Sequence, residues 1–265
     1  MSSSIRHFIL FRDIPLMYGR VPKVANSSIK SSLCKLLDKK PDKSIKTTAD
    51  RFWRQHTQGE TQLITTIQAR RLRATHFSFS FVRNPFDRLI AAYNNKILEI
   101  EDVPKPMKLM GLYHSMPFEE FIYKVCGTES DNLDNHVRPQ AEILLAENKI
   151  VPKFVGRMEH IDTHWKQLRK RMKLEGLPPL GLLPHKNVRR NNKKDIADYF
   201  KKSELVDLVL ARYAVDFKRF YGPYNVDQLL FGDQLALEQP LQRGLAKAKQ
   251  RFRSLSSNQI ESINA

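Results

Sequence analysis

The sequence contains few of the residues that stabilise a small secreted domain or a fibrous chain. Only two of its 265 residues are cysteines, Cys34 and Cys126, and no CxxC pair occurs. One disulfide is arithmetically feasible, but two free thiols in a reducing compartment are the simpler expectation. Ten glycines and 14 prolines exclude a collagen-like repeat. A chain of this length buries enough surface to fold without covalent or metal staples.

Long apolar runs are absent as well. The apolar stretch at residues 5–12 is interrupted by charge and is too short for the apolar region of a signal peptide. No stretch approaches the roughly 18 consecutive apolar residues of a transmembrane helix. We therefore expect a cytoplasmic protein with neither signal peptide nor membrane span.

Acidic residues are scarce relative to basic ones. The chain has 45 Lys and Arg against 28 Asp and Glu, a formal net charge of +17. Such an excess attracts polyanions of any kind, nucleic acid among them. Helix-turn-helix, RRM and zinc-finger signatures are missing, however. A nucleic-acid-binding protein is therefore kept as the alternative to whatever function the motifs indicate.

Segments with strand-like and helix-like patterns alternate along the chain. Short strands are expected at 16–21, 77–82 and 153–156, each followed by a turn and a helical pattern. Further helices are expected at 48–54, 61–72, 118–125, 161–173 and 197–221, the last broken near Ser203. This alternation predicts an α/β fold in which helices flank a central parallel sheet.

We expect a main domain over residues 1–224 and a helical C-terminal extension over residues 225–265. Within the extension, residues 234–255 carry apolar and basic side chains at helical spacing, which predicts an amphipathic helix. Such a helix packs on its own domain or on a partner subunit, or lies on an anionic membrane surface. The sequence leaves homo-oligomerisation and peripheral attachment to the inner membrane face open.

The first segment that carries chemistry follows the strand at 16–21. It reads Arg20-Val21-Pro22-Lys23-Val24-Ala25-Asn26-Ser27-Ser28 and leads into a helix, for which Ser27 or Ser28 is the expected N-cap. A tight turn from strand to helix gathers backbone N–H groups that bind phosphate or sulfate. Taken alone, the pattern also fits an ordinary capped helix. A P-loop kinase is disfavoured because the Walker pattern GxxxxGK[ST] is absent.

The second segment follows the strand at 77–82 and reads Arg83-Asn84-Pro85-Phe86-Asp87-Arg88. Arg83 stands at the carboxyl end of that strand, where open α/β sheets bind their ligands. A guanidinium group there can grip a phosphate with two hydrogen bonds. Pro85 suits the first turn of a helix. Arg88, one turn into the helix, is by itself more typical of a structural ion pair.

Together these two segments resemble the motifs of sulfotransferase family 2. In that family a PKV(A/S)-type loop binds the 5′-phosphosulfate of 3′-phosphoadenosine 5′-phosphosulfate (PAPS), and an RxPxxR element binds its 3′-phosphate. Later segments are similar to further family motifs, in the same order, so the resemblance spans about residues 15–224. These segments are 134–140, 153–159, 183–187 and 213–221.

The resemblance implies a P-loop-like sulfotransferase fold, PAPS as the co-substrate, no metal, and a carbohydrate or glycolipid hydroxyl as the acceptor. Ala91 departs from the family, which usually has at this position a Ser that helps to hold the 3′-phosphate, so that contact is either lost or supplied by another group. Lys23 is also expected to be catalytic, by stabilising charge on the departing nucleotide. The implied cofactor-binding residues are Arg20, Pro22, Lys23, Val24, Ala25, Asn26, Ser27, Ser28, Arg83, Arg88, Lys186 and Asn187.

His136 is the expected catalytic base. It lies in Asp134-Asn135-His136-Val137-Arg138-Pro139-Gln140, which looks like the family's acidic-His-x-x-Pro-Gln segment. An acceptor hydroxyl is a poor nucleophile until a base takes its proton, and an unperturbed imidazole titrates near neutrality. Asp134 is expected to orient the ring. Without the motif, a His in a polar loop would be interpreted as a surface residue.

Other patterns are interpreted as solvated surface. His160 and His164 have the four-residue spacing of metal ligands, but no third ligand accompanies them. Two basic runs, 166–173 and 186–194, are typical of exposed faces, although the second lies in a loop expected near the nucleotide. Most of the positive charge is then left for a large anionic acceptor or a membrane surface.

Overall fold

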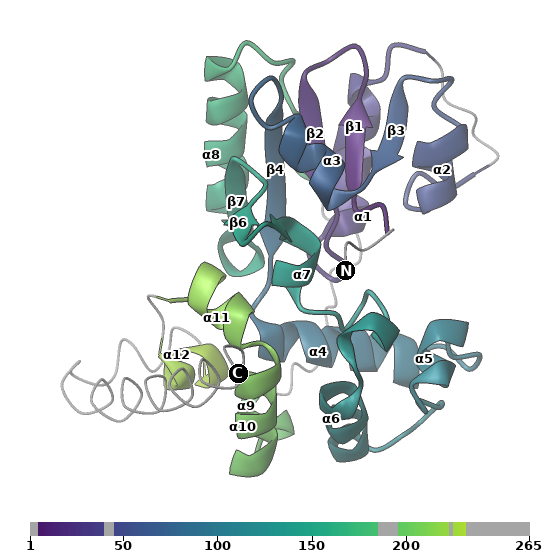
Figure 1. The fold of residues 1–265 in the computed structure, drawn as a ribbon, viewed down its shortest axis with the longest axis vertical. Helices are drawn as coiled ribbons and strands as arrows, with labels where there is room; N and C mark the ends of the chain where they lie inside the picture. Colours follow the sequence, from purple (N-terminus) through teal and green to yellow (C-terminus); the bar gives the residue numbers. More distant parts are fainter. Residues whose placement is uncertain (1–4, 40–44, 185–195, 223–224, 232–265) are drawn as a thin grey trace. The chain divides into compact units, whose positions relative to one another are not determined.

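The computed structural model describes residues 5–39, 45–184, 196–222 and 225–231 (Figure 1). The chain divides into two compact units, Met1–Arg83 with Gln140–Arg190, and Asn84–Pro139 with Asn191–Ala265. The chain therefore leaves the first unit after Arg83 and returns to it at Gln140. Lys186 and Asn187 lie outside the described residues, as does the amphipathic segment 234–255.

The first unit is built on a five-stranded sheet with the order β3-β1-β2-β4-β7. Strands β2, β4 and β7 are parallel, whereas β1 pairs antiparallel with both β2 and β3. The α/β class is confirmed, but the sheet is mixed rather than wholly parallel. The reason is the four-residue link between β1 and β2, which is far too short for a parallel crossover. The strands are β1 Phe8–Phe11, β2 Leu16–Gly19, β3 Thr61–Ile64, β4 Phe77–Val82 and β7 Phe154–Arg157.

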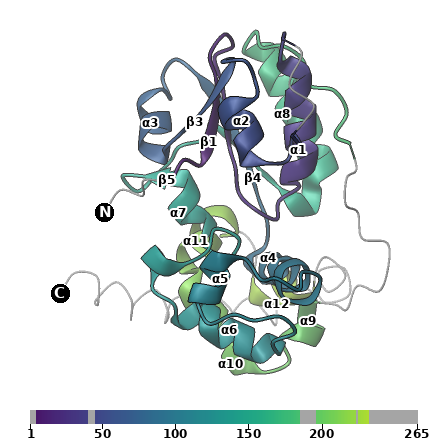
Figure 2. The ribbon, with the colours of Figure 1, turned by 90° about the vertical axis from the view of Figure 1, so that its right-hand side faces the viewer.

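Helices cover both faces of this sheet. Figure 2 shows α3 (Thr66–Arg71) on one side of the strands and α1 (Asn26–Leu33) with α8 (Ile161–Leu174) on the other. All six residues of β4 are buried, as expected for a strand covered on both faces. The remaining elements of this unit are α2 (Asp50–Gln55), α7 (Gln140–Leu144) and the hairpin of β5 (Leu145–Ala146) and β6 (Lys149–Ile150).

The helix expected at 61–72 is wrong over its first half. Residues 61–64 form β3, because these apolar and β-branched side chains extend the sheet beside β1. Thr65 then starts α3 with a capping box: its hydroxyl accepts from the Gln68 amide at 3.2 Å, and its own amide donates to Gln68 Oε1 at 2.9 Å. The helical periodicity therefore belongs only to residues 66–71.

The described residues of the second unit form helices and connecting loops without a strand. Its core is aromatic: the ring of Phe86 lies 5.0 Å from that of Phe200 and 5.4 Å from that of Phe217. The break expected near Ser203 is confirmed, since α9 ends at Tyr199 and α10 begins at Ser203. The helices are α4 Pro85–Tyr93, α5 Lys105–Leu109, α6 Phe118–Gly127, α9 Ile196–Tyr199, α10 Ser203–Arg212, α11 Ala214–Phe220 and α12 Val226–Phe231.

The start of the expected C-terminal extension belongs to the core of this second unit. Leu229, on α12, is 4% exposed, and its carbonyl accepts a 2.6 Å hydrogen bond from the Asn84 side chain. Within the described ranges, no helix combines the length and the apolar character needed to cross a bilayer.

Candidate functional site

The loop between β2 and α1 contains two residues with left-handed backbone. Lys23 and Ala25 both adopt left-handed conformations, with φ of 69° and 55°. This backbone costs roughly 1–2 kcal/mol per residue other than glycine, so the surrounding structure must hold it. The residue between them has ordinary negative φ. Backbone that alternates between left-handed and right-handed residues can aim N–H groups to one side, as anion-binding turns do.

The expected cap at Ser27 or Ser28 is wrong. Helix α1 begins at Asn26, and Ala25 occupies the N-cap position without a side-chain hydrogen bond to the helix. The reason is the left-handed turn at Ala25, which starts the helix at least two residues earlier than a serine cap would. Both serines therefore lie in the first turn, half-buried and buried. The helix start thus has no capping side chain that would compete with an anion for its N–H groups.

Two hydrogen bonds fix this loop to the sheet. Ser80 on β4 donates to the carbonyl of Gly19, the last residue of β2, at 2.7 Å. Tyr18 on β2 donates to the Asn26 side chain at 3.1 Å. Burial raises the pKa of Tyr18, so it stays protonated as a donor. Both ends of the loop are thereby held at the carboxyl edge of β2.

A single carboxylate binds cations on both sides of the loop. Asp50, on α2, accepts a hydrogen bond from Lys30 of α1 at 2.8 Å and pairs with the guanidinium of Arg20. Burial opposes ionisation of Asp50, but the charges and hydrogen bonds of the two cations outweigh it and lower its pKa to about 2. Arg20, expected as a nucleotide contact, is thus engaged by Asp50 and by the carbonyl of Arg6.

A hydrogen bond from the Arg83 side chain connects the second motif with the first. The Arg83 guanidinium Nη1 donates to the carbonyl of Lys23 at 3.2 Å. Its backbone is held by the fully buried Gln140 in a reciprocal pair: the Arg83 amide donates to Gln140 Oε1 at 2.9 Å, and Gln140 Nε2 donates to the Arg83 carbonyl at 2.8 Å. The two connections between the units, at Arg83 and Gln140, are therefore joined to each other within the first unit.

Arg88 lies in the second unit and is 1% exposed. Its guanidinium donates to the carbonyls of Asn135 at 3.0 Å and Arg138 at 2.8 Å. These hydrogen bonds hold the ends of the short loop that carries His136. This is a structural role, as the sequence favours for Arg88 taken alone, although the acceptors are backbone carbonyls.

Asp134 and His136 form a close pair in that loop. One Asp134 oxygen accepts from the His136 amide at 2.8 Å and lies 2.7 Å from its Nδ1. Burial opposes ionisation of Asp134, but the hydrogen bonds and charge of His136 outweigh it, so the pKa of Asp134 lies below its usual value. An ionised Asp134 keeps the proton on Nδ1 and leaves Nε2 as the basic nitrogen. The His136 side chain is 30% exposed.

His160 and His164 do not form a recognisable metal site. Their rings lie 5.6 Å apart, and His164 Nδ1 accepts a hydrogen bond from the Arg157 amide at 2.8 Å. No group of three or more His, Cys, Asp or Glu in the described part of the chain is arranged to hold a metal ion.

Comparison with protein families gives one match. The model of a family described as "Sulfotransferase family" matches residues 6–223, which covers the β2–α1 loop, Arg83, Arg88 and His136. Comparison with curated proteins and with solved structures finds no match.

Proposed function

The protein belongs to the sulfotransferase family, and on this basis we propose that it transfers a sulfuryl group from PAPS to a hydroxyl of a carbohydrate or glycolipid. The observation that carries the proposal is the hydrogen bond between Arg83 and the carbonyl of Lys23. It joins an anion-binding loop to a guanidinium at the end of the neighbouring parallel strand. The donor has anionic groups at two ends, which suits two such cationic elements.

The chain's own residues fit this donor. The N–H groups of residues 23–28, with the Ser27 and Ser28 hydroxyls, are proposed to hold the 5′-phosphosulfate, and Arg83 the 3′-phosphate. Lys186 and Asn187 belong to the same proposal through the family resemblance. Because Arg20 and Arg88 are engaged within the protein, their proposed part is to position the loops rather than to grip the phosphates.

We propose His136 as the base. When bound, PAPS supplies an activated sulfuryl group. His136 Nε2 takes the proton of the acceptor hydroxyl as its oxygen bonds to sulfur, and the bond from sulfur to the bridging phosphate oxygen breaks. Lys23 stabilises the negative charge that develops on that oxygen as adenosine 3′,5′-bisphosphate departs. His136 then releases its proton to solvent. In-line placement and charge stabilisation suffice for this class of transfer.

Transfer of labelled sulfate from PAPS to a panel of glycan and glycolipid acceptors tests the proposal. Lys23→Ala and Arg83→Ala should abolish transfer, because each removes a cation from the donor site. His136→Ala should lower turnover by at least 10²-fold while binding of adenosine 3′,5′-bisphosphate persists. Lys35→Ala is the matched control. It removes one positive charge from an exposed position just after α1, and this variant should remain active. Full activity of both donor-site variants would contradict the assignment.

We further propose that the remaining positive charge draws the enzyme to an anionic acceptor or to an anionic membrane surface on the cytoplasmic side. The support is electrostatic: the first unit holds 27 Lys and Arg and only 10 Asp and Glu. The donor site uses only a few of these cations, so most of the excess is available to a larger anionic partner.

A further inference from the structure

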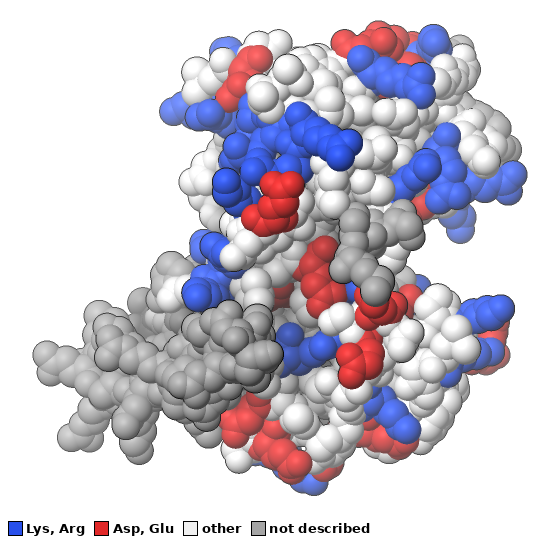
Figure 3. Space-filling view, viewed as in Figure 1, with Lys and Arg blue, Asp and Glu red and all other residues white. Residues whose placement is uncertain are grey.

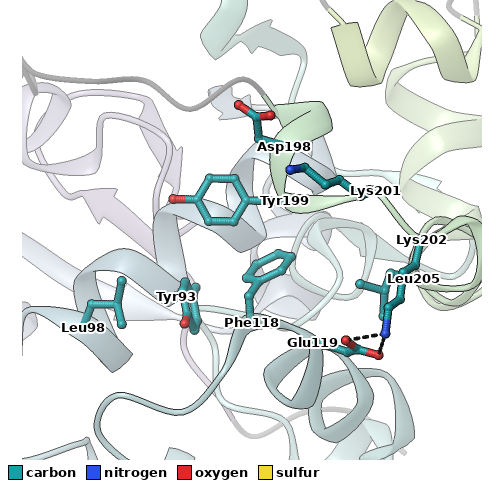
Figure 4. A pocket seen from close by; sticks show the side chains of 9 residues that line it. All are labelled: Tyr93, Leu98, Phe118, Glu119, Asp198, Tyr199, Lys201, Lys202 and Leu205. Carbon is teal, nitrogen blue, oxygen red and sulfur yellow. Dashed lines mark hydrogen bonds and ion pairs between the residues drawn. The ribbon is translucent and has the colours of Figure 1, made fainter.

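The second unit contains a cavity of about 390 Å³, in the size range of small-molecule sites. Its lining comes from α4 and the turn that follows it, from α6, and from α9, α10 and the residues between them (Figure 4). Three aromatic rings, two leucines and a few charged side chains surround it. The residues that matter here are Tyr93, Leu98, Phe118, Asp198, Tyr199 and Lys201.

The aromatic rings hold one another in place. Phe118 packs edge-on against Tyr93 and against Tyr199, with ring centroids 5.0 Å apart in both pairs. The Tyr93 hydroxyl donates to the carbonyl of Met116 at 2.7 Å, and the Tyr199 hydroxyl to the Asn94 side chain at 3.4 Å. Because both hydroxyls are engaged, the tyrosines offer ring carbon to a ligand. Edge-to-face pairs of this kind are favourable and hold the rings in place, so the surface is preformed.

The charged side chains of the lining balance to zero. Glu119 and Lys202 pair with each other at 2.6 Å. Asp198 and Lys201 are exposed, and neither pairs with another residue in the part of the chain that the structure describes. They therefore offer one acceptor and one donor group beside the aromatic rings. A net charge of zero gives no preference for an anion, in contrast to the β2–α1 loop and Arg83 of the first unit.

The same part of α4 connects the cavity with the proposed base. The helix continues into a π-helical turn, Asn94–Leu98; Tyr93, just before this turn, and Leu98, its last residue, line the cavity. Such turns are rare in proteins, and those that occur are often found at functional sites. Lys96, within the turn, lies close enough to Asp134 for its charge to help to lower the pKa of that carboxyl. This turn thus contributes to the lining of the cavity and to the charges around Asp134.

We propose that this cavity binds an uncharged sugar unit of the acceptor. The C–H face of the ring packs on Tyr199 and Phe118, and its hydroxyls bond to Asp198 and Lys201. That the bound sugar belongs to the acceptor rests on the proposed sulfotransferase function. The binding of a sugar in this cavity does not depend on that function. A wholly apolar ligand fits less well, because it would strip water from Asp198 and Lys201 without replacing their hydrogen bonds.

Saturation-transfer NMR on the full chain, without donor, tests the site. The neutral probes are the methyl β-glycosides of glucose, galactose and N-acetylglucosamine. The comparison probes are methyl β-glucuronide, which is anionic, and cyclohexanol, which is apolar. At least one neutral glycoside should receive saturation. Asp198→Asn and Tyr199→Leu should weaken that binding at least threefold, whereas Asp131→Asn, an exposed carboxyl of the same unit outside the cavity, should not change it.

Three results would overturn the inference: no neutral glycoside binds, the glucuronide binds more tightly, or only cyclohexanol binds. An equal loss in Asp131→Asn would also overturn it, because the effect would then not be local. Failure of the proposed function is distinguishable. If a glycoside binds at this cavity but no acceptor receives labelled sulfate, the site stands and the sulfotransfer proposal fails. If sulfate is transferred but no neutral glycoside binds, only the proposed sugar site is contradicted and the sulfotransfer proposal stands.

Discussion

The two units of the molecule differ in charge far more than in size. The first contains 27 Lys and Arg and 10 Asp and Glu, so the whole net charge of +17 falls within it. The second contains 18 of each and is formally neutral. The basic residues therefore accompany the β2–α1 loop and Arg83, whereas the neutral unit holds His136 and the aromatic cavity. The distribution of charge between the two units agrees with the proposal that the first binds a polyanionic donor and the second an acceptor sugar.

The surface of the first unit shows the excess directly. Figure 3 shows Lys and Arg side chains gathered where α3 and β7 lie in Figure 1. Arg70 and Arg71 end α3, Arg73 follows it, and Lys153 precedes β7. Arg73 and Lys153 precede the parallel strands β4 and β7, whereas the β2–α1 loop and Arg83 follow the carboxyl ends of β2 and β4. These basic residues are thus separate from the β2–α1 loop and Arg83.

The largest effect on stability is expected for Arg88, a cation that is buried in the formally neutral second unit. In Arg88→Met the guanidinium is lost and the carbonyls of Asn135 and Arg138 lose their donors. Each charge-assisted hydrogen bond contributes about 1.5–3 kcal/mol, so the free energy of unfolding should fall by about 3 kcal/mol or more. Urea denaturation followed by circular dichroism measures it. Arg88→Lys keeps the charge without the planar fork and should be intermediate. A change below about 0.5 kcal/mol would mean that the loop around His136 is held by other contacts.

A smaller effect is expected at Asp50, one of the few acids of the basic unit. Asp50→Asn leaves Arg20 and the buried Lys30 without a full counter-charge. Since half of the Asp50 side chain is exposed to solvent, we expect a loss of roughly 1–2 kcal/mol rather than the larger cost of a fully buried pair. The left-handed backbone at Lys23 and Ala25 should then be less well held, and the affinity for adenosine 3′,5′-bisphosphate should fall, which calorimetry measures.

The pH dependence of the Asp50 variant follows from its pKa. The folded pKa of about 2 lies below the usual value of about 3.9, so the stabilisation is present above pH 4 and is lost as the pH falls toward 2. The difference in stability between wild type and Asp50→Asn should therefore shrink across that interval. A difference that stays constant from pH 5 to pH 2 would show that the charge of Asp50 is not its contribution.

The sequence predicts the parts of this structure that local patterns determine. Strand β4 has the predicted bounds because Phe and Ser alternate up to Arg83, and Asn84 and Pro85 then begin α4. The β2–α1 loop, Arg83 and the Asp134–His136 pair follow from motifs. Strand β1 has no alternation, because all four of its residues are apolar, and β3 continues directly into the helical pattern of residues 66–71, so the sequence predicts neither.

Contacts between distant residues could not be predicted in the same way. Lys30 and Asp50 are separated by 20 positions, and Arg83 and Gln140 by 57. Gln140 belongs to a recognised motif. Its two hydrogen bonds to the Arg83 backbone, however, depend on the folded chain leaving the first unit and returning to it at neighbouring points. The cavity combines residues from four helices and has no sequence signature. Only the folded structure shows these features.

The smallest effect on stability, and the most direct test of the charge difference, comes from paired surface changes. Arg71→Gln with Lys153→Gln removes two exposed cations from the first unit, and Lys105→Gln with Lys124→Gln removes two from the second. All four are surface positions, so each pair should alter the unfolding free energy by less than about 1 kcal/mol. Elution from a heparin column separates the pairs: the first should elute at clearly lower salt than wild type, the second close to it, because only the first unit has a surplus of cations to attract a polyanion. Equal shifts would mean that net charge alone, and not its concentration in one unit, governs the attraction.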